Sequence, residues 1–337
     1  MKAAVLFQPG EICIQTTPAP MPKTGEVRVR LRLCGICGSD IHFFKGDRLL
    51  GKPTIIGHEG LGEIDRVGDG VAHRKIGERV VVEPNIPCRQ CAWCLQGKGN
   101  ICIAKRSIGV NEAGCFAEYI CLPEQFCHTI PHTISDQDAV TLEPMAVAYH
   151  ALMMAPAKPG DTIAVIGLGA IGLLLTHLAL RLGYRVLVSE LKEHKNRQAI
   201  AMGAKPVTEA GSVDTFSAEL LRENVSAVFE CAGSEFTASL AVAVAPRGTQ
   251  VILVGLSEKQ ASFQPLKLVR EGIALKGAII YDQLIDFKRV IQLIQAGIIH
   301  PGQIISKTVP LENISEAITF AAKGDDSKII ISIAELL

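Results

Sequence analysis

The sequence lacks any segment dominated by charge of one sign. It contains 34 lysines and arginines and 34 aspartates and glutamates, so its formal net charge is zero. Proteins whose main partner is nucleic acid or an anionic membrane surface gather basic residues into patches or runs. The charge balance therefore argues against nucleic acid and membranes as partners and favours a small-molecule partner.

Long apolar runs are also missing. The first apolar residues meet Pro9, Gly10 and Glu11 before the core of a secretory signal can form. The most apolar later stretch, residues 170–182, is interrupted by a histidine and an arginine and is too short to span a bilayer. A cytoplasmic protein is the simplest expectation. In that reducing compartment the eleven cysteines are expected to be thiols or metal ligands and not disulfides.

Two kinds of pattern divide the 337 residues, and a chain of this length is expected to form two domains. Residues 1 to about 130 show short alternating runs with recurrent glycine and proline, which is typical of β-rich structure. From about residue 150 strand-like and helix-like runs alternate, which predicts a parallel sheet with helices on both faces. The expected elements there are strands at 162–166, 185–189, 227–230 and 249–254, and helices at 170–182 and from about 236. Helices at 285–296 and 314–322 and a strand at 328–333 follow.

Four cysteines form the pattern C-x2-C-x2-C-x7-C. Four thiolates this close in sequence can surround one tetrahedral zinc ion, and a closed shell of four sulfurs leaves no position for substrate. An iron–sulfur cluster is the alternative, but no second cluster motif and no following proline accompany the cysteines. The pattern therefore predicts a structural zinc lobe at about residues 84–105, with the ligands Cys88, Cys91, Cys94 and Cys102.

Residues 167–172 (GLGAIG) match G-x-G-x-x-G between a predicted strand and a predicted helix. In that context the first glycine allows a tight turn, the second lets a pyrophosphate approach the backbone, and the third lets helix and strand pack closely. The helix N-terminus then faces the phosphates. Glu190 ends the next strand, where an acid accepts hydrogen bonds from the ribose hydroxyls and repels a 2′-phosphate, which favours NAD over NADP. The predicted cofactor-binding residues are Gly167, Gly169, Ala170, Ile171, Gly172 and Glu190.

A second group of metal-binding residue types precedes the lobe. Cys37, His58 and Glu59 offer a thiolate, an imidazole and a carboxylate, all of which zinc accepts. Their spacing does not bring them together without help from the fold. Cys34 and Cys37 alone also fit a redox C-x-x-C pair, and His58 alone fits a buried core histidine.

Taken together, these motifs resemble the zinc-containing medium-chain dehydrogenase/reductase superfamily along essentially the whole chain. The resemblance rests on residues 35–42 (GICGSDIH), 57–59 (GHE), 114–119 (GCFAEY) and 143–144 (EP), with the four-cysteine lobe and the glycine turn in the same order. It implies a discontinuous β-rich GroES-like catalytic domain, residues 1–149 and 285–337. A Rossmann doubly wound NAD-binding domain, residues 150–284, completes the expected α/β architecture. A homodimer or homotetramer is implied as well.

The resemblance also assigns roles. Cys37 and His58 are similar to the catalytic zinc ligands, and Glu59 to the adjacent glutamate that binds the zinc or exchanges on and off it. Glu143 falls where alcohol dehydrogenases supply a second cysteine ligand and polyol dehydrogenases a glutamate, so the resemblance implies Glu143 as a further catalytic residue and ligand of this zinc. Ser39 matches the hydroxyl that hydrogen-bonds the alcohol, and His42 the end of the proton relay. Two zinc ions per chain and NAD are therefore the expected cofactors.

The residues near Glu143 resemble the polyol (sorbitol-type) and sugar-acid branch, which oxidises a secondary alcohol to a ketone. Two departures oppose a free polyol: Phe43 replaces a usual tyrosine, and Ile280 replaces a usual arginine. A sugar acid or other modified polyol is the better expectation. Threonine dehydrogenase is the alternative, since residues 109–111 and 114–119 resemble it, but its Gly-Asn-Ala-Val after the acidic residue and proline is absent. A non-catalytic NAD-binding protein is the alternative from another class.

Overall fold

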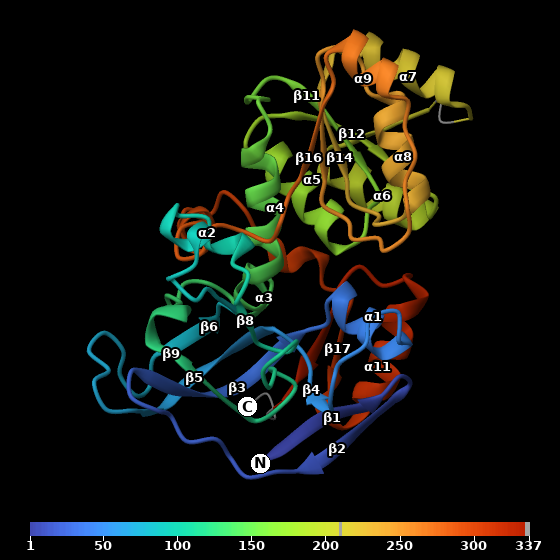
Figure 1. The fold of residues 1–337 in the computed structure, drawn as a ribbon. Coiled ribbons are helices and arrows are strands. Elements are labelled where there is room, and N and C mark those ends of the chain that lie inside the picture. The colour runs from blue at the N-terminus through green and yellow to red at the C-terminus, as the bar shows by residue number, and fades with distance from the viewer. Residues whose placement is uncertain (209–210, 334–337) are drawn as a thin grey trace. The chain divides into compact units, whose positions relative to one another are not determined.

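The computed structural model describes residues 1–208 and 211–333. The chain forms two compact units, one from Met1–Glu143 with Asp282–Leu337 and the other from Pro144–Tyr281 (Figure 1). The sequence had placed these boundaries at 149/150 and 284/285. The first division lies within helix α4 (Leu142–Met154), which contains both Glu143 and Pro144.

The second unit contains a six-stranded sheet in which every neighbouring pair of strands is parallel. The strand order is β13-β12-β11-β14-β15-β16. The central strand β11 is buried at all five positions, as expected for a parallel strand covered on both faces. The order reverses between β11 and β14, and ligands of such sheets bind at that switch point, outside the carboxyl ends of the strands. The bounds are β11 Thr162–Ile166, β12 Arg185–Ser189, β13 Lys205–Pro206, β14 Val225–Glu230, β15 Gln250–Leu253 and β16 Ala274–Gly277.

Helices connect these strands. Eight of the twelve residues of α5 are buried, so this helix packs deeply after the glycine turn. The side chains of Ser212 and Ser234 cap α7 and α8 by accepting from the backbone N–H three residues later, which satisfies one orphan donor at each helix start. The helices are α5 Ala170–Arg181, α6 Glu193–Met202, α7 Val213–Arg222, α8 Glu235–Val244 and α9 Pro265–Glu271.

A seven-stranded sheet forms the centre of the first unit. Its order is β10-β6-β5-β3-β18-β17, with β9 also paired to β3. Strand β3 lies between β5 and β18, so strands from both ends of the chain meet along it. Alternating buried residues of these strands, such as Val27, Val29 and Leu31, build the core of this unit. The bounds are β3 Glu26–Gly35, β5 Glu59–Val67, β6 Arg79–Val82, β9 Tyr119–Pro123, β10 Cys127–Thr129, β17 Lys307–Pro310 and β18 Ile329–Ser332.

Smaller elements surround this sheet. A three-stranded sheet has the order β2-β1-β4, and β7 pairs with β8 in a two-stranded ribbon. These strands are β1 Lys2–Gln8, β2 Glu11–Thr16, β4 Thr54–Ile55, β7 Asn85–Ile86 and β8 Arg106–Ser107. The helices are α1 Gly38–Lys45, α2 Ala92–Leu95, α3 Asp136–Val140, α10 Asp286–Gln295 and α11 Ile314–Lys323. Short 3-10 turns lie at Gly99–Ile101, Glu124–Phe126, Pro301–Ile304 and Leu311–Asn313.

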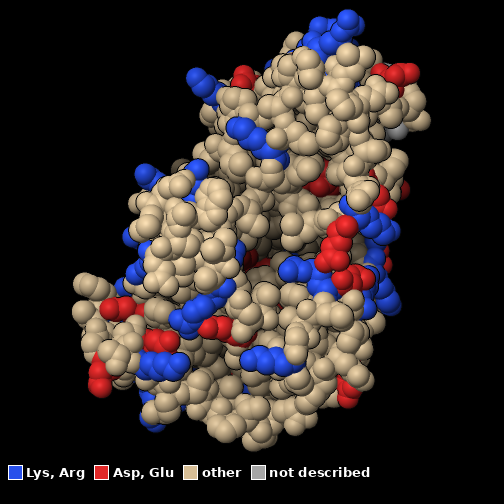
Figure 2. All heavy atoms as spheres, in the orientation of Figure 1, with Lys and Arg blue, Asp and Glu red and all other residues tan. Residues whose placement is uncertain are grey.

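Acidic and basic side chains are interspersed with uncharged residues over the face that Figure 2 shows. Within residues 1–208 and 211–333, no helix has both the length and the apolar character required to cross a membrane.

Candidate active site and metal centres

The first candidate site is built around the start of α1. Cys37 is the N-cap residue of this helix, with extended backbone angles. The Asp40 carboxylate is fully buried and accepts two backbone N–H bonds, from Cys37 at 2.9 Å and from Gly57 at 3.1 Å. Asp40 therefore ties the loop of Cys37 to the loop that precedes His58. Oδ1 of Asp40 also lies 3.7 Å from Nδ1 of His58, beyond hydrogen-bond distance.

Cys37, His58 and Glu59 converge. Each offers one ligand atom, and these atoms all lie within 4.8 Å of one another. His58 exposes 12% of its side chain and Glu59 none of it. Nδ1 of His58 and Oε1 of Glu59 are buried and make no hydrogen bond, while Oε2 of Glu59 is paired only with Lys328. Because buried polar atoms are almost always satisfied, such atoms around a thiol fit a metal ion as the missing partner.

The charges of this cluster also fit a cation. Burial opposes the charged form of His58, but Asp40 and Cys37 outweigh it and hold the pKa of His58 well above its usual value. Burial raises the pKa of Glu143 to about 7, while His58 lowers it and Glu59 raises it. The negative groups around His58 thus stabilise a positive charge on its imidazole. A metal ion bound there can supply that positive charge in place of the proton.

Lys328 is a member of this cluster that sequence reasoning missed. Its side chain is 1% exposed and forms an ion pair with Oε2 of Glu59. Its ammonium also donates to the carbonyl of Ile36 at 2.9 Å. Burial lowers the pKa of Lys328, but Glu59 and Cys37 outweigh that and raise it. The only signal in the sequence is a lysine that opens an otherwise apolar strand.

The two proposed relay residues lie on α1 itself. Ser39 is in the first turn of the helix, two residues after the N-cap residue Cys37, and is partly buried. His42 lies one turn further along and is exposed over 46% of its side chain. Its Nδ1 lies 2.9 Å from Oδ2 of Asp47, which fixes the orientation of the ring.

The four-cysteine lobe forms the second candidate metal centre. The sulfurs of Cys88, Cys91, Cys94 and Cys102 lie within 4.8 Å of one another. Backbone N–H groups already point at them: Cys88 donates to the sulfur of Cys102 at 3.2 Å, and Cys91 to that of Cys88 at 3.4 Å. A backbone hydrogen bond from Cys94 is the main cause that lowers the pKa of Cys91 to about 6. Burial raises the pKa of Cys94 to about 12, so it is the proximity of the four sulfurs, and not their pKa values, that fits a structural zinc ion.

The glycine turn joins β11 to α5. Gly167 has a φ of +90°, and a Cβ there would lie 2.6 Å from Ala232. A Cβ at Gly172 would lie 1.9 Å from the carbonyl oxygen of Gly167, whereas one at Gly169 would meet nothing within 4 Å. Gly167 and Gly172 therefore permit the turn and its packing, and Gly169 leaves open space where a phosphate can approach. Ala170 and Ile171 follow as the first residues of α5.

Glu190 follows β12 and lies against this turn. One carboxylate oxygen accepts from the N–H of Leu168 at 2.7 Å, and the other accepts from the N–H of Lys192 at 3.0 Å. The acidic group is thus held next to the glycine turn, where the resemblance places the adenosine ribose.

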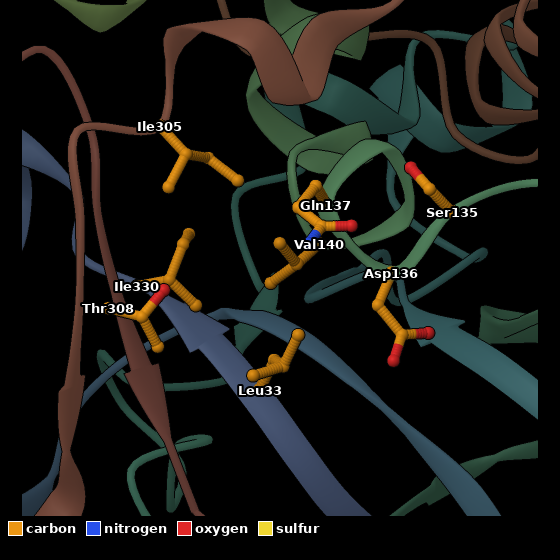
Figure 3. A pocket seen from close by; sticks show the side chains of 8 residues that line it. All are labelled: Leu33, Ser135, Asp136, Gln137, Val140, Ile305, Thr308 and Ile330. Atoms are coloured by element: carbon orange, nitrogen blue, oxygen red, sulfur yellow. The ribbon is translucent and has the colours of Figure 1, made fainter. Parts of the chain in front are cut away.

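The first unit also has a cavity of about 350 Å³ that contains none of the predicted site residues. Figure 3 shows its lining, in which side chains of α3 face those of β3, β17 and β18. Its carboxylate, Asp136, is already paired with Arg79 at 2.6 Å and with Arg32 at 3.1 Å. The cavity therefore has no charged group free to bind a ligand.

Comparison with known proteins covers both units. Residues 23–132 match the family model of the alcohol dehydrogenase GroES-like domain, and residues 170–296 match that of the zinc-binding dehydrogenases. Sorbitol dehydrogenase of Bacillus subtilis is 30% identical over 94% of this chain and 92% of its own.

Solved structures agree. An Escherichia coli alcohol dehydrogenase (rspB), solved with NADH, has a TM-score of 0.91 at 27% identity and covers 99% of each chain. Galactitol-1-phosphate dehydrogenase of the same species has a TM-score of 0.92 at 26% identity, covering 99% of this chain and 100% of its own. The expected combination of a GroES-like unit and a doubly wound nucleotide-binding unit is therefore confirmed.

Proposed function

We propose that this chain, which belongs to the zinc-binding alcohol dehydrogenase family, oxidises a secondary alcohol of a small sugar-derived substrate to a ketone. The substrate is a polyol, a sugar acid or a related sugar derivative, and the hydride acceptor is NAD. The convergence of Cys37, His58 and Glu59 around buried atoms without hydrogen bonds carries this proposal.

Each residue of the first site has a role in this reaction. Cys37, His58 and Glu59 would hold the catalytic zinc ion, with Glu143 close by, and the ion supplies a Lewis acid that lowers the pKa of the substrate hydroxyl. Ser39 would hydrogen-bond that hydroxyl and accept its proton while passing its own proton on toward the cofactor ribose and His42. His42, oriented by Asp47, is the outward end of the relay and releases the proton to solvent.

The glycine turn and Glu190 would bind the cofactor. Gly167, Gly169, Ala170, Ile171 and Gly172 bring backbone N–H groups and the start of α5 to the pyrophosphate. Glu190 accepts from the ribose hydroxyls, and its negative charge disfavours the 2′-phosphate of NADP. The nicotinamide ring supplies the hydride acceptor.

The substrate class rests on the neighbourhood of Glu143 and on the relatives. Sorbitol dehydrogenase and galactitol-1-phosphate dehydrogenase are named for a polyol and for a phosphorylated polyol. Phe43 is buried within the core and has no hydroxyl, so it offers no hydrogen bond to a free polyol. Ile280 likewise offers no donor. A polyol modified by an acid or phosphate group is the favoured substrate.

An activity screen tests this function. Zinc-loaded protein is supplied with NAD or NADP and a panel of polyols, polyol phosphates, sugar acids and L-threonine, and reduced cofactor is followed by its absorbance. The expected result is turnover with NAD on a polyol, polyol phosphate or sugar acid, and weaker turnover with NADP. Turnover on L-threonine alone supports the amino-alcohol alternative, and binding of NAD without turnover on any alcohol supports a non-catalytic role.

A homodimer or homotetramer is proposed as well. Strand β16 is at the edge of its sheet, and all four of its residues are exposed. Large apolar side chains in the adjoining segments are exposed too, including Phe263, Leu266 and Val269. An exposed strand edge beside apolar surface is normally paired with another segment. The same strand of a second subunit can pair with it across a two-fold axis. Light scattering that gives a monomer mass at micromolar concentration would contradict this.

A further inference from the structure

The ion pair between Lys328 and Glu59 occupies space that a glycine provides. Gly35 ends β3 and is paired with Glu59 on β5 and with Ile330 on β18. A Cβ on Gly35 would lie 1.9 Å from Oε2 of Glu59 and 3.0 Å from Cε of Lys328. The backbone of Gly35 does not have a positive φ, so this position requires glycine for space and not for conformation. Three neighbouring strands thus form a compartment for one carboxylate and one ammonium.

Lys328 is fixed in that compartment independently of the metal ligands. Its ammonium donates to the carbonyl of Ile36 at 2.9 Å. Its own carbonyl accepts from the N–H of Ser306 at 2.8 Å and from the hydroxyl of the same residue at 2.9 Å. The ammonium of Lys328 therefore has a second acceptor besides Glu59, whereas the carboxylate of Glu59 has no partner among the described residues other than Lys328.

A buried lysine is costly unless it serves a charge that also has to be buried. Glu59 faces two positions of positive charge. One is the Lys328 ammonium, and the other is the point enclosed by the Cys37 sulfur and the His58 imidazole, within 4.8 Å of its carboxylate. A metal ion at that point would compete with the ammonium for the same carboxylate.

We propose that Lys328, seated in the space left by Gly35, is a positioning residue that draws Glu59 away from the metal. It keeps Glu59 a reversible ligand, so that a substrate oxygen can take the position that the carboxylate leaves. This inference rests on the proposed zinc site and adds to it the group that controls one of its ligands.

The test is the rate at which zinc leaves the protein for a chelator. Lys328→Met keeps the length and apolar stem of the side chain and removes its charge. Without the competing ammonium Glu59 stays on the metal, so zinc should leave the catalytic site at least fivefold more slowly than in wild type. Turnover at saturating substrate should fall about tenfold. A merely structural lysine predicts the opposite, because a disrupted site releases its metal faster.

A second readout does not depend on activity. With cobalt(II) in place of the catalytic zinc, the visible ligand-field bands should shift in Lys328→Met and return toward wild type in Lys328→Arg, which restores the charge. The matched control is Lys307→Met, which removes the ion pair of Lys307 on β17 with Asp326, a residue that precedes β18. That control should change neither the release rate nor the spectrum.

Gly35→Ala disturbs the same contact between Glu59 and Lys328 but leaves the lysine in place. The added Cβ takes the place of the Glu59 carboxylate oxygen and separates it from an intact lysine, so slower zinc release is again expected. This variant decides the question if Lys328→Met does not fold. Release that is unchanged or faster in the variant that folds would overturn the proposal.

Zinc content distinguishes failure of the proposed function from failure of this inference. Wild type should contain two zinc ions per chain, and Cys37→Ser should retain one. A wild-type chain with a single zinc would remove the catalytic zinc and this inference together. Two zincs with unaltered release in Lys328→Met would remove only the role of Lys328.

Discussion

The two candidate metal centres of the first unit are assembled in opposite ways. The four cysteines of the lobe come from one short stretch, with Cys88 and Cys102 only 14 positions apart. The other centre takes Cys37 from the start of a helix, His58 and Glu59 from the start of a strand, and Lys328 from near the end of the chain, 292 positions from its partner Ile36. Only the sheet order, which puts β3 between β5 and β18, brings these groups together.

This difference in assembly predicts a difference in function. A lobe held by four sulfurs has little core of its own, so its zinc should contribute to folding. The site on the sheet is supported by packed strands whether or not a metal is bound, so its zinc should contribute to chemistry. Variants of the two centres should therefore fail in different assays.

The largest effect is expected from Cys37→Ser. Loss of the thiolate removes the catalytic zinc, and kcat/KM should fall about a thousandfold or more because a Lewis acid contributes several kcal/mol to such a reaction. The fold should remain, since Cys37 is held by backbone bonds to the buried Asp40. Circular dichroism and NAD binding by fluorescence titration should match wild type. Near-native turnover in this variant would refute the zinc mechanism.

Cys91→Ser should reverse that pattern. The lobe would lose its zinc, and because such a zinc contributes to folding, the free energy of unfolding should drop by at least about 3 kcal/mol, the upper end for most single substitutions. Thermal melting with zinc analysis measures this, and Cys13→Ser, at an exposed cysteine outside both centres, is the control. A Cys91→Ser protein that melts as wild type does and keeps two zincs would show that the lobe is not a zinc site.

The same contrast explains what the sequence could predict. The four-cysteine spacing and the glycine turn are local, and both lie where the sequence placed them. Strand β11 spans the predicted residues 162–166, and α5 ends one residue before the predicted 182. The sequence analysis did not predict helix α4. Pro144 in its first turn is a residue that helix starts favour, but that one signal did not identify the helix.

Lys328 and Gly35 show the limit of sequence reasoning. Lys328 was expected only as the first residue of a final strand, and Gly35 only as part of a motif. Gly35 leaves the space in which Lys328 meets Glu59. That contact forms only because β3 lies between β5 and β18, which are far apart in sequence. No spacing rule within one segment contains that information.

The smallest expected effect compares a lysine at each centre. Lys105 lies at the lobe, donates to the carbonyl of Asn100 at 3.2 Å, and has a pKa lowered by burial and raised by Cys102. Zinc with four thiolates carries a net charge of −2, which a nearby ammonium stabilises. Zinc with one thiolate, one carboxylate and a neutral imidazole carries none, and there the ammonium only competes for the carboxylate.

Lys105→Met should therefore speed zinc release from the lobe by about threefold or less, the size of a partly exposed charge interaction. This sign is opposite to that expected for Lys328→Met. Slower release from the lobe in Lys105→Met would show that the two lysines act alike and that net charge does not separate the two centres.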